Sequence, residues 1–140
     1  MNPREYLLQL RLLRKTIDSN VDEINKLRSL CSVVPTADFS KERISGGEQS
    51  DKIATLVSKI VDLENEIQSE IDEAIDLERE IRTVINRQEN ETERLLLKLR
   101  YIDFNTWEEI AEKTGYSTVQ VWRIHKIALK NLDFPEKEKI

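Results

Sequence analysis

The sequence predicts an all-α protein in which a long antiparallel helical hairpin, or coiled-coil rod, is followed by a C-terminal helix-turn-helix domain. Apolar residues recur at steps of three and four through most of residues 1–90, which is the spacing of a coiled-coil seam. Residues 106–132 contain two helix starts separated by a glycine, which is typical of two short helices joined by a tight turn. We therefore expect a rod at 1–90, a small domain at 91–134 and a tail at 135–140.

The first expected helix covers about residues 3–31. Pro3 suits a first helical turn, because an N–H group has no helical partner there. Asn20 interrupts the apolar seam, whose other members are Tyr6, Leu10, Leu13, Ile17, Ile24, Leu27 and Cys31. The chain has one cysteine and hence no intramolecular disulfide, so Cys31 is expected to be a small buried apolar residue.

The second expected helix covers about residues 50–89 and would be roughly 60 Å long at about 1.5 Å per residue. Its expected seam consists of Ile53, Val57, Ile60, Ile67, Ile71, Ala74, Ile81 and Ile85. Glu64 and Glu78 occupy the two seam positions that lack an apolar residue. These carboxylates either limit the pairing register by penalising misaligned burial or lie at the edge of the seam.

Residues 32–49 connect the two helices and are expected to form a loop. They contain a proline, two glycines and several serines, and they show no apolar period. A loop of this length allows the first helix to fold back antiparallel on the second. Charge favours this pairing, since residues 1–31 hold six basic and four acidic side chains and residues 48–93 hold five basic and fourteen acidic ones.

The second helix is longer than the first by roughly ten residues, about 15 Å at helical rise. Its far end, with Ile81 and Ile85, therefore needs another apolar surface. This surface is expected on another copy of the chain, on the helix-turn-helix domain or on a different protein. A two-helix hairpin also has a thin core, so we expect a homodimer. The alternative is a monomer that becomes fully ordered only on a partner.

Residues 106–132 predict the helix-turn-helix itself. Two pairs of residues have the spacing of a capping box, Thr106 with Glu109 and Ser117 with Gln120. Gly115 lies where the first helix must stop, a position that favours a residue tolerant of positive φ. The core between the two helices is expected to consist of Ile110, Ala111, Val121, Ile124, Ala128 and Leu132.

The exposed face of the second of these helices is the candidate DNA-binding surface. Residues 117–132 hold three Arg or Lys side chains and no Asp or Glu, in a chain of formal net charge -5. In a helix-turn-helix such a face enters the major groove of double-stranded DNA. The side chains expected at base edges are Thr118, Val119, Gln120 and Arg123. Those expected at phosphates are Ser117, Lys126, Lys130 and His125, and a packed or solvated position is the alternative for His125.

A family resemblance supports this interpretation. Residues 94–132 read RLLLKLRYIDFNTWEEIAEKTGYSTVQVWRIHKIALKNL and resemble region four of bacterial sigma factors. The RY at 100–101, the WEEIA at 107–111, the GYS at 115–117 and residues 50–67 are similar to small phage and prophage proteins of low-GC Gram-positive bacteria. Those proteins are described as sigma-factor-like or ArpU-type transcriptional regulators. The resemblance implies DNA binding and control of phage gene expression.

The resemblance also suggests a second use for the acidic rod, as a surface that docks on host RNA polymerase. The alternative is that the acidic charge only keeps the rod solvated. Two other functions stay open, a DNA-packaging component similar to a small terminase subunit and a structural coiled-coil adaptor. Small terminase subunits usually place the DNA domain before the oligomerisation segment, the reverse of the order here, which favours the regulator.

The composition argues against several other classes of protein. One histidine and one cysteine, far apart, do not make a zinc site, and we expect no cofactor. The many Asp and Glu residues are expected at solvent positions without an apolar pocket, so we do not expect an enzyme. No run of eighteen apolar residues occurs, so we expect no membrane span and a protein of the bacterial host cytoplasm, associated with the nucleoid.

Overall fold

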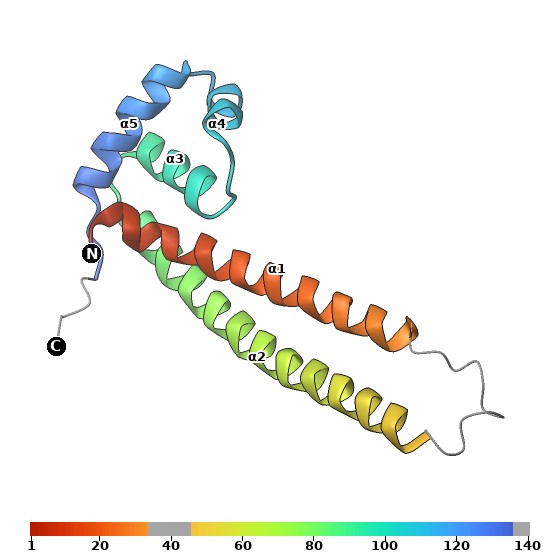
Figure 1. Cartoon of the computed structure of the whole chain (residues 1–140). Coiled ribbons are helices and arrows are strands. Elements are labelled where there is room, and N and C mark those ends of the chain that lie inside the picture. Colours follow the sequence, from red (N-terminus) through yellow and green to blue (C-terminus); the bar gives the residue numbers. More distant parts are fainter. Residues whose placement is uncertain (34–45, 136–140) are drawn as a thin grey trace. The chain divides into compact units, whose positions relative to one another are not determined.

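The computed structural model describes residues 1–33 and 46–135, and all regular structure in this part of the chain is helical (Figure 1). The helices are α1 (Pro3–Val33), α2 (Gly46–Asn86), α3 (Glu91–Tyr101), α4 (Trp107–Thr114) and α5 (Thr118–Asn131). The expected all-α class is thus confirmed for the described residues. Among these helices, none combines the length and the apolar character that a membrane span requires.

The two long helices differ from the expected ones at their ends. α1 continues to Val33, and α2 begins at Gly46, four residues before the expected start, and ends at Asn86. Glycine at the start of α2 does not prevent helix formation, since a glycine costs only about 1 kcal/mol relative to alanine. The central part of the expected loop, residues 34–45, and the end of the tail, residues 136–140, lie outside the described residues.

The chain divides into two compact units, and both long helices contribute to each of them. One unit comprises residues 1–14 and 73–140, and the other comprises residues 15–72. The first turns of α1 and the last turns of α2 therefore belong to the same unit as α3, α4 and α5.

In the unit of residues 15–72, α1 and α2 pack side by side and run antiparallel (Figure 1). Its apolar contact contains Ile24 of α1 and Ile60 and Ile67 of α2, with Ile17, Leu27, Cys31 and Leu63 packed against them. Two polar contacts run across the pair: Asn20 donates to Glu70 at 2.7 Å, and Arg28 donates to Glu64 at 2.8 Å. Asn20 thus interrupts the apolar seam with a hydrogen bond.

Most of the expected buried face of α2 is found, since five of its eight residues are buried: Ile60, Ile67, Ala74, Ile81 and Ile85. The other three, Ile53, Val57 and Ile71, are 37%, 48% and 36% exposed, and Leu63 packs against the contact between α1 and α2 instead. Steps of three and four along α2 produce two neighbouring apolar stripes, and a contact with one helix buries only one of them. Glu64 lies at the edge of the contact, half exposed, with its carboxylate on Arg28.

In the unit of residues 1–14 and 73–140, α3, α4 and α5 surround a core of Leu96, Leu99, Ile110 and Val121. The expected core residues Ala128 and Leu132 are also buried, and Ala111 and Ile124 are partly buried against the cluster. Burial in this unit extends to Leu7 and Leu10 of α1 and to Ile81, Val84 and Ile85 of α2. Ile81 and Ile85 are therefore buried in the unit that also contains α3, α4 and α5, so of the three surfaces expected for them the one within the chain is found.

Polar contacts attach the end of α5 to the link between α2 and α3 and to the first turn of α3. Gln88 is buried and donates to the carbonyl of Ala128 at 2.9 Å. Asn131 donates to the buried carboxylate of Glu93 at 3.1 Å. Both bonds join α5 to residues about forty positions earlier in the chain, so they fix the end of α5 against these residues.

Candidate nucleic-acid interface

The start of α5 is set by its capping residues. The hydroxyl of Ser117 accepts from the Gln120 N–H at 3.2 Å, and the Gln120 side chain accepts from the Ser117 N–H at 2.9 Å. These two bonds form the expected capping box, which satisfies two backbone donors at once. The first side chains after the cap, from Thr118 onward, therefore leave the helix at a fixed angle.

The turn before α5 is short because α4 ends abruptly at a glycine. Gly115 has φ 78° and ψ 3°, in the left-handed region, and its N–H donates to the Ala111 carbonyl at 2.9 Å. Three residues, 115–117, then separate α4 from α5. At the other end of α4, Thr106 caps the Glu109 N–H at 3.2 Å, while its hydroxyl donates to the Glu109 carboxylate. In the expected capping box the Glu109 side chain would accept from the Thr106 N–H, but here it accepts from the Thr106 hydroxyl instead.

One face of α5 is fixed by burial against α3 and α4. Val121, His125 and Ala128 on this face are each at most 1% exposed. The opposite face remains open, and its exposed side chains include Thr118, Val119, Gln120, Trp122, Arg123, Lys126, Ile127 and Lys130. Of the eight side chains expected at DNA, all except His125 are exposed, and the structure brings them together on this face and at its cap.

His125 is a correction to the expected set of phosphate contacts. Its ring is 1% exposed, and Nε2 lies 2.6 Å from the hydroxyl of Tyr101. Burial, and then the nearby Arg4 and Arg100, lower the pKa of His125 to about 4. A buried, neutral ring cannot meet a phosphate at the surface, so the packed alternative for this histidine is the one that holds.

The Gln120 side chain also belongs to the N-terminal cap of α5, which limits the base contact expected of it. Its Oε1 atom accepts the Ser117 N–H, which uses one of the two lone pairs of this oxygen and holds the amide in the cap. Bidentate pairing with adenine needs both the oxygen and the nitrogen of the amide. Gln120 could therefore read an adenine in that way only if its oxygen accepted a second hydrogen bond or its side chain left the cap.

A group of aromatic side chains packs beside α5, in contacts that the sequence does not predict individually. Trp107 of α4 lies edge-on to Trp122 at a centroid distance of 5.2 Å and to His125 at 4.7 Å. The guanidinium of Arg100 lies 4.2 Å from the centroid of Trp107. Trp122 and His125 are three residues apart and so share a side of α5, which is a signal that the sequence does carry. Their partners on α3 and α4 follow only from the packing of the helices.

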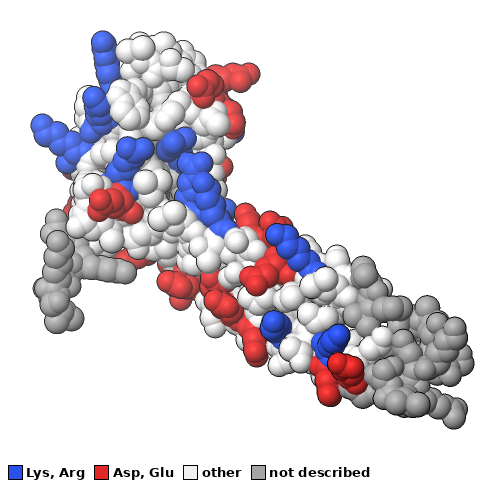
Figure 2. All heavy atoms as spheres, in the orientation of Figure 1, with Lys and Arg blue, Asp and Glu red and all other residues white. Residues whose placement is uncertain are grey.

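The open face of α5 is basic and without counter-ions. Among the described residues, no carboxylate forms an ion pair with Arg123, Lys126 or Lys130. On the side of the molecule drawn in Figure 2, several Lys and Arg side chains project from the part that holds α3 to α5. Unpaired cations on one helical face favour binding of a polyanion.

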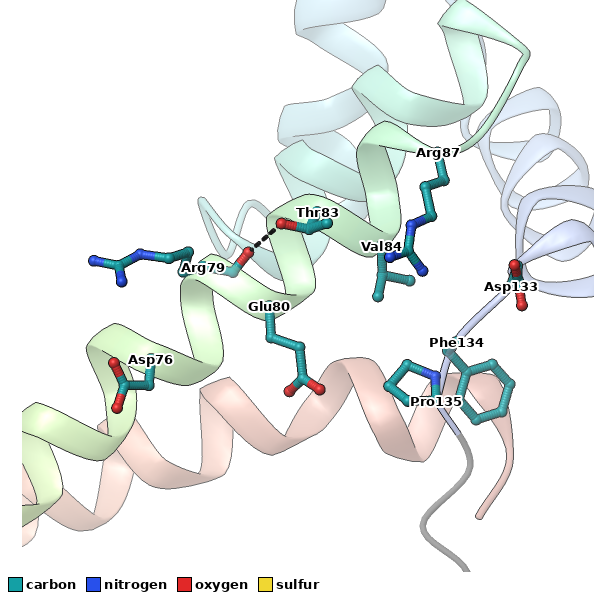
Figure 3. Close-up of a pocket in the computed structure, with 9 residues that line it drawn as sticks. All are labelled: Asp76, Arg79, Glu80, Thr83, Val84, Arg87, Asp133, Phe134 and Pro135. Atoms are coloured by element: carbon teal, nitrogen blue, oxygen red, sulfur yellow. Dashed lines mark hydrogen bonds between the residues drawn. The ribbon is translucent and has the colours of Figure 1, made fainter.

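A surface hollow of about 570 Å³ lies elsewhere in the same unit, between the end of α2 and the segment after α5 (Figure 3). Its lining combines both signs of charge with Phe134 and Pro135, and the Arg79 side chain points away from these two rings. None of the side chains expected at DNA lines this hollow. We assign no ligand to it.

Comparison with known families gives one match, to a model that covers residues 33–133 and is described as a protein of unknown function, DUF1492. The chain belongs to the DUF1492 family. The matched part of this DUF1492 protein includes α2 to α5 and hence the whole candidate interface. No curated protein and no solved structure matches the chain significantly.

Proposed function

We propose that this protein is a sequence-specific regulator of transcription that binds double-stranded DNA. The observation that carries the proposal is the position of α5. Val121 and Ala128 hold one face of the helix against α3 and α4, and the opposite face carries unpaired cations behind a capped N-terminus. A helix presented in this way after a tight turn has the form of the recognition helix of a helix-turn-helix.

The first two turns of α5 would read base edges in the major groove. Arg123 suits a bidentate pair with guanine, and the methyl groups of Val119 and Thr118 suit the methyl of thymine. Val119 is 58% exposed, so its methyl groups are free to contact a ligand. Gln120 would contribute one amide N–H while it remains in its cap.

Ser117 and the distal cations of α5 would hold the DNA backbone. Lys126 and Lys130 follow Arg123 toward the end of the helix, and all three side chains are exposed. Ammonium groups suit phosphates as point charges, which fix register without reading sequence. Substitution of a base-reading residue should therefore affect DNA binding differently from substitution of a phosphate-binding residue.

The resemblance to sigma region four and to ArpU-type regulators adds the biological setting to the proposal. It supports control of phage genes in the cytoplasm of a bacterial host. In this setting the paired α1 and α2 would serve for dimerisation or for docking on RNA polymerase, of which we favour dimerisation.

The partner that we propose for α2 is a second copy of the chain. Ile53, Val57, Val61 and Ile71 form an exposed apolar stripe on one face of α2, next to the buried seam. Val57 and Ile71 are each seven residues from Glu64. A two-fold axis at Glu64 would thus place Val57 of one copy on Ile71 of the other in an antiparallel contact. Arg28 already pairs with Glu64, so charge at the centre of the contact is compensated.

Sedimentation velocity tests this partner. Val57→Lys combined with Ile71→Lys should convert a dimer into a monomer, because two charges would enter the apolar contact on each copy. The matched control is Ser58→Lys combined with Ser69→Lys, which adds the same charge at exposed positions of α2 outside the stripe. A dimer that survives the first pair of substitutions would exclude this surface, and a monomeric wild-type protein would exclude the dimer.

Selection of bound fragments from a random duplex library at near-physiological salt tests the function. An enriched two-fold repeat would support a dimeric operator reader, and one asymmetric motif would support a single reader for each site. No enrichment, together with no duplex binding at low salt, would reject the proposal and leave the structural adaptor. A ring of eight or more copies in the sedimentation experiment would favour the packaging function instead.

A further inference from the structure

Arg100 is a cation that the sequence-based interpretation did not use. It lies in the last turn of α3, where its guanidinium stacks on Trp107 at 4.2 Å and donates to the Asn105 carbonyl at 3.0 Å. These two contacts hold the group in one orientation while it stays partly exposed. No carboxylate lies within ion-pair distance of it among the described residues.

Two further cations come from the start of α1. Arg4 and Arg11 are seven residues apart, two helical turns, and so lie on the same side of α1. Arg11 is three residues from Arg14, whose guanidinium lies 4.9 Å from the ring of Phe104 in the segment after α3, so this side of α1 faces the end of α3.

The charges around Arg100 agree with this arrangement. Burial lowers the pKa of Arg100, and Arg11 and Arg4 lower it further, while Tyr101 and Glu108 raise it. All three arginines belong to the same compact unit.

Arg14 of α1 differs from Arg4 and Arg11 because it has an ion pair. Arg14 is ion-paired to Glu78 at 3.1 Å and lies over the Phe104 ring at 4.9 Å. Arg4 and Arg11 have no such ion pair within the part of the chain that the structure describes. Three like charges that form no ion pair among the described residues favour the binding of an anion.

Aromatic contacts connect this group to the open face of α5. From Arg100 the contacts pass to Trp107, then to Trp122 at a centroid distance of 5.2 Å, and then to Lys126, whose Nζ atom lies 5.6 Å from the Trp122 centroid. Trp122 is 40% exposed, so this row of side chains reaches the surface. The cations of α3 and α5 are thus connected through two tryptophans.

We propose that Arg4, Arg11 and Arg100 form a second phosphate-binding site, which holds the DNA backbone beside the groove that α5 enters. This inference rests on the proposed DNA binding and extends the protein surface involved from α5 to α3 and α1. Guanidinium groups bind phosphate oxygens bidentately, and an arginine fixed by stacking loses little conformational freedom on binding. The site would add affinity and orientation without sequence preference.

The test is the salt dependence of binding to a random-sequence duplex, measured by fluorescence anisotropy. Arg4→Ala combined with Arg11→Ala should lower the slope of log Kd against log salt by about two, since each phosphate contact contributes about 0.9. Binding to a selected sequence and to random duplex should weaken by the same factor. Arg4→Lys combined with Arg11→Lys should keep the wild-type slope, because the slope counts charges rather than their geometry.

The matched control is Arg79→Ala combined with Arg82→Ala, which removes two cations from α2 in the same unit. The control should keep the wild-type slope, and thermal unfolding should show that both pairs of substitutions leave the protein folded. An equal slope for the α1 variant and the wild type would overturn the second site and leave the proposed function intact. A wild-type protein that binds no duplex at low salt would instead overturn the proposed function, and this inference with it.

Discussion

The hydroxyl of Tyr101 on α3 lies 2.6 Å from Nε2 of His125 on α5, and both side chains are buried. The two rings also stack, with centroids 5.7 Å apart. The Nδ1 atom of His125 is buried without a hydrogen-bond partner among the described residues. This pair therefore joins the proposed recognition helix to the helix before the turn through a neutral imidazole.

The neutral imidazole predicts an acid-sensitive fold. Burial lowers the pKa of His125 from 6.5 to about 4. Between these values the unfolded chain binds a proton that the folded chain does not, so stability is full above pH 6.5 and is lost as the pH falls toward 4. At about 1.4 kcal/mol per pH unit the loss is at most ~3.5 kcal/mol. Urea denaturation across this range should show a smaller pH dependence in His125→Phe than in the wild type, and equal dependence would contradict the prediction.

Removal of the Tyr101 hydroxyl should also destabilise the fold. Tyr101→Phe leaves the ring in place but deprives Nε2 of its partner, so the free energy of unfolding should fall by roughly 1 to 3 kcal/mol. The double variant with His125→Phe should be less destabilised than the sum of the two single variants, because no polar atom is then left unpaired. Additive effects in this cycle would mean that the bond contributes nothing.

Gly115→Ala should destabilise the protein through the backbone alone. An added Cβ would meet no atom within 4 Å, but the residue has φ 78°. The left-handed conformation costs a non-glycine residue about 1 to 2 kcal/mol. Gly115→Asn is the matched control and should cost less, since asparagine tolerates this conformation better. Thermal unfolding that ranks alanine level with the wild type would disprove this account of the turn.

Arg123 and Lys130 should have different effects on DNA binding. Arg123→Ala should reduce discrimination at one base pair by about 1 to 3 kcal/mol, because it removes a base contact. Lys130→Ala should weaken binding to all sequences and lower the salt slope by about one, because it removes a phosphate contact. Competition between a selected sequence and random duplex separates the two effects. Equal losses on both duplexes for Arg123→Ala would contradict its base-reading role.

Local signals in the sequence predicted most of the small helices correctly. The capping pair of Ser117 and Gln120 and the glycine at 115 act over three or four residues, so their meaning does not depend on distant segments. The helical spacing of apolar residues such as Ile110, Val121 and Ala128 likewise predicted the buried faces of α4 and α5.

The features that the sequence left undecided depend on contacts between distant segments. Whether His125 faces solvent or Tyr101, and which of two apolar stripes on α2 is buried, depends on which helix packs against each face. The same holds for Arg4 and Arg11, which share a compact unit with Arg100 although they lie 96 and 89 positions before it in the chain. The sequence by itself determined where helices begin and which faces are apolar, because these properties are local. Only the tertiary structure decided which of those faces is covered. A buried face needs a second surface from a distant segment, and local periodicity does not show which segment provides it.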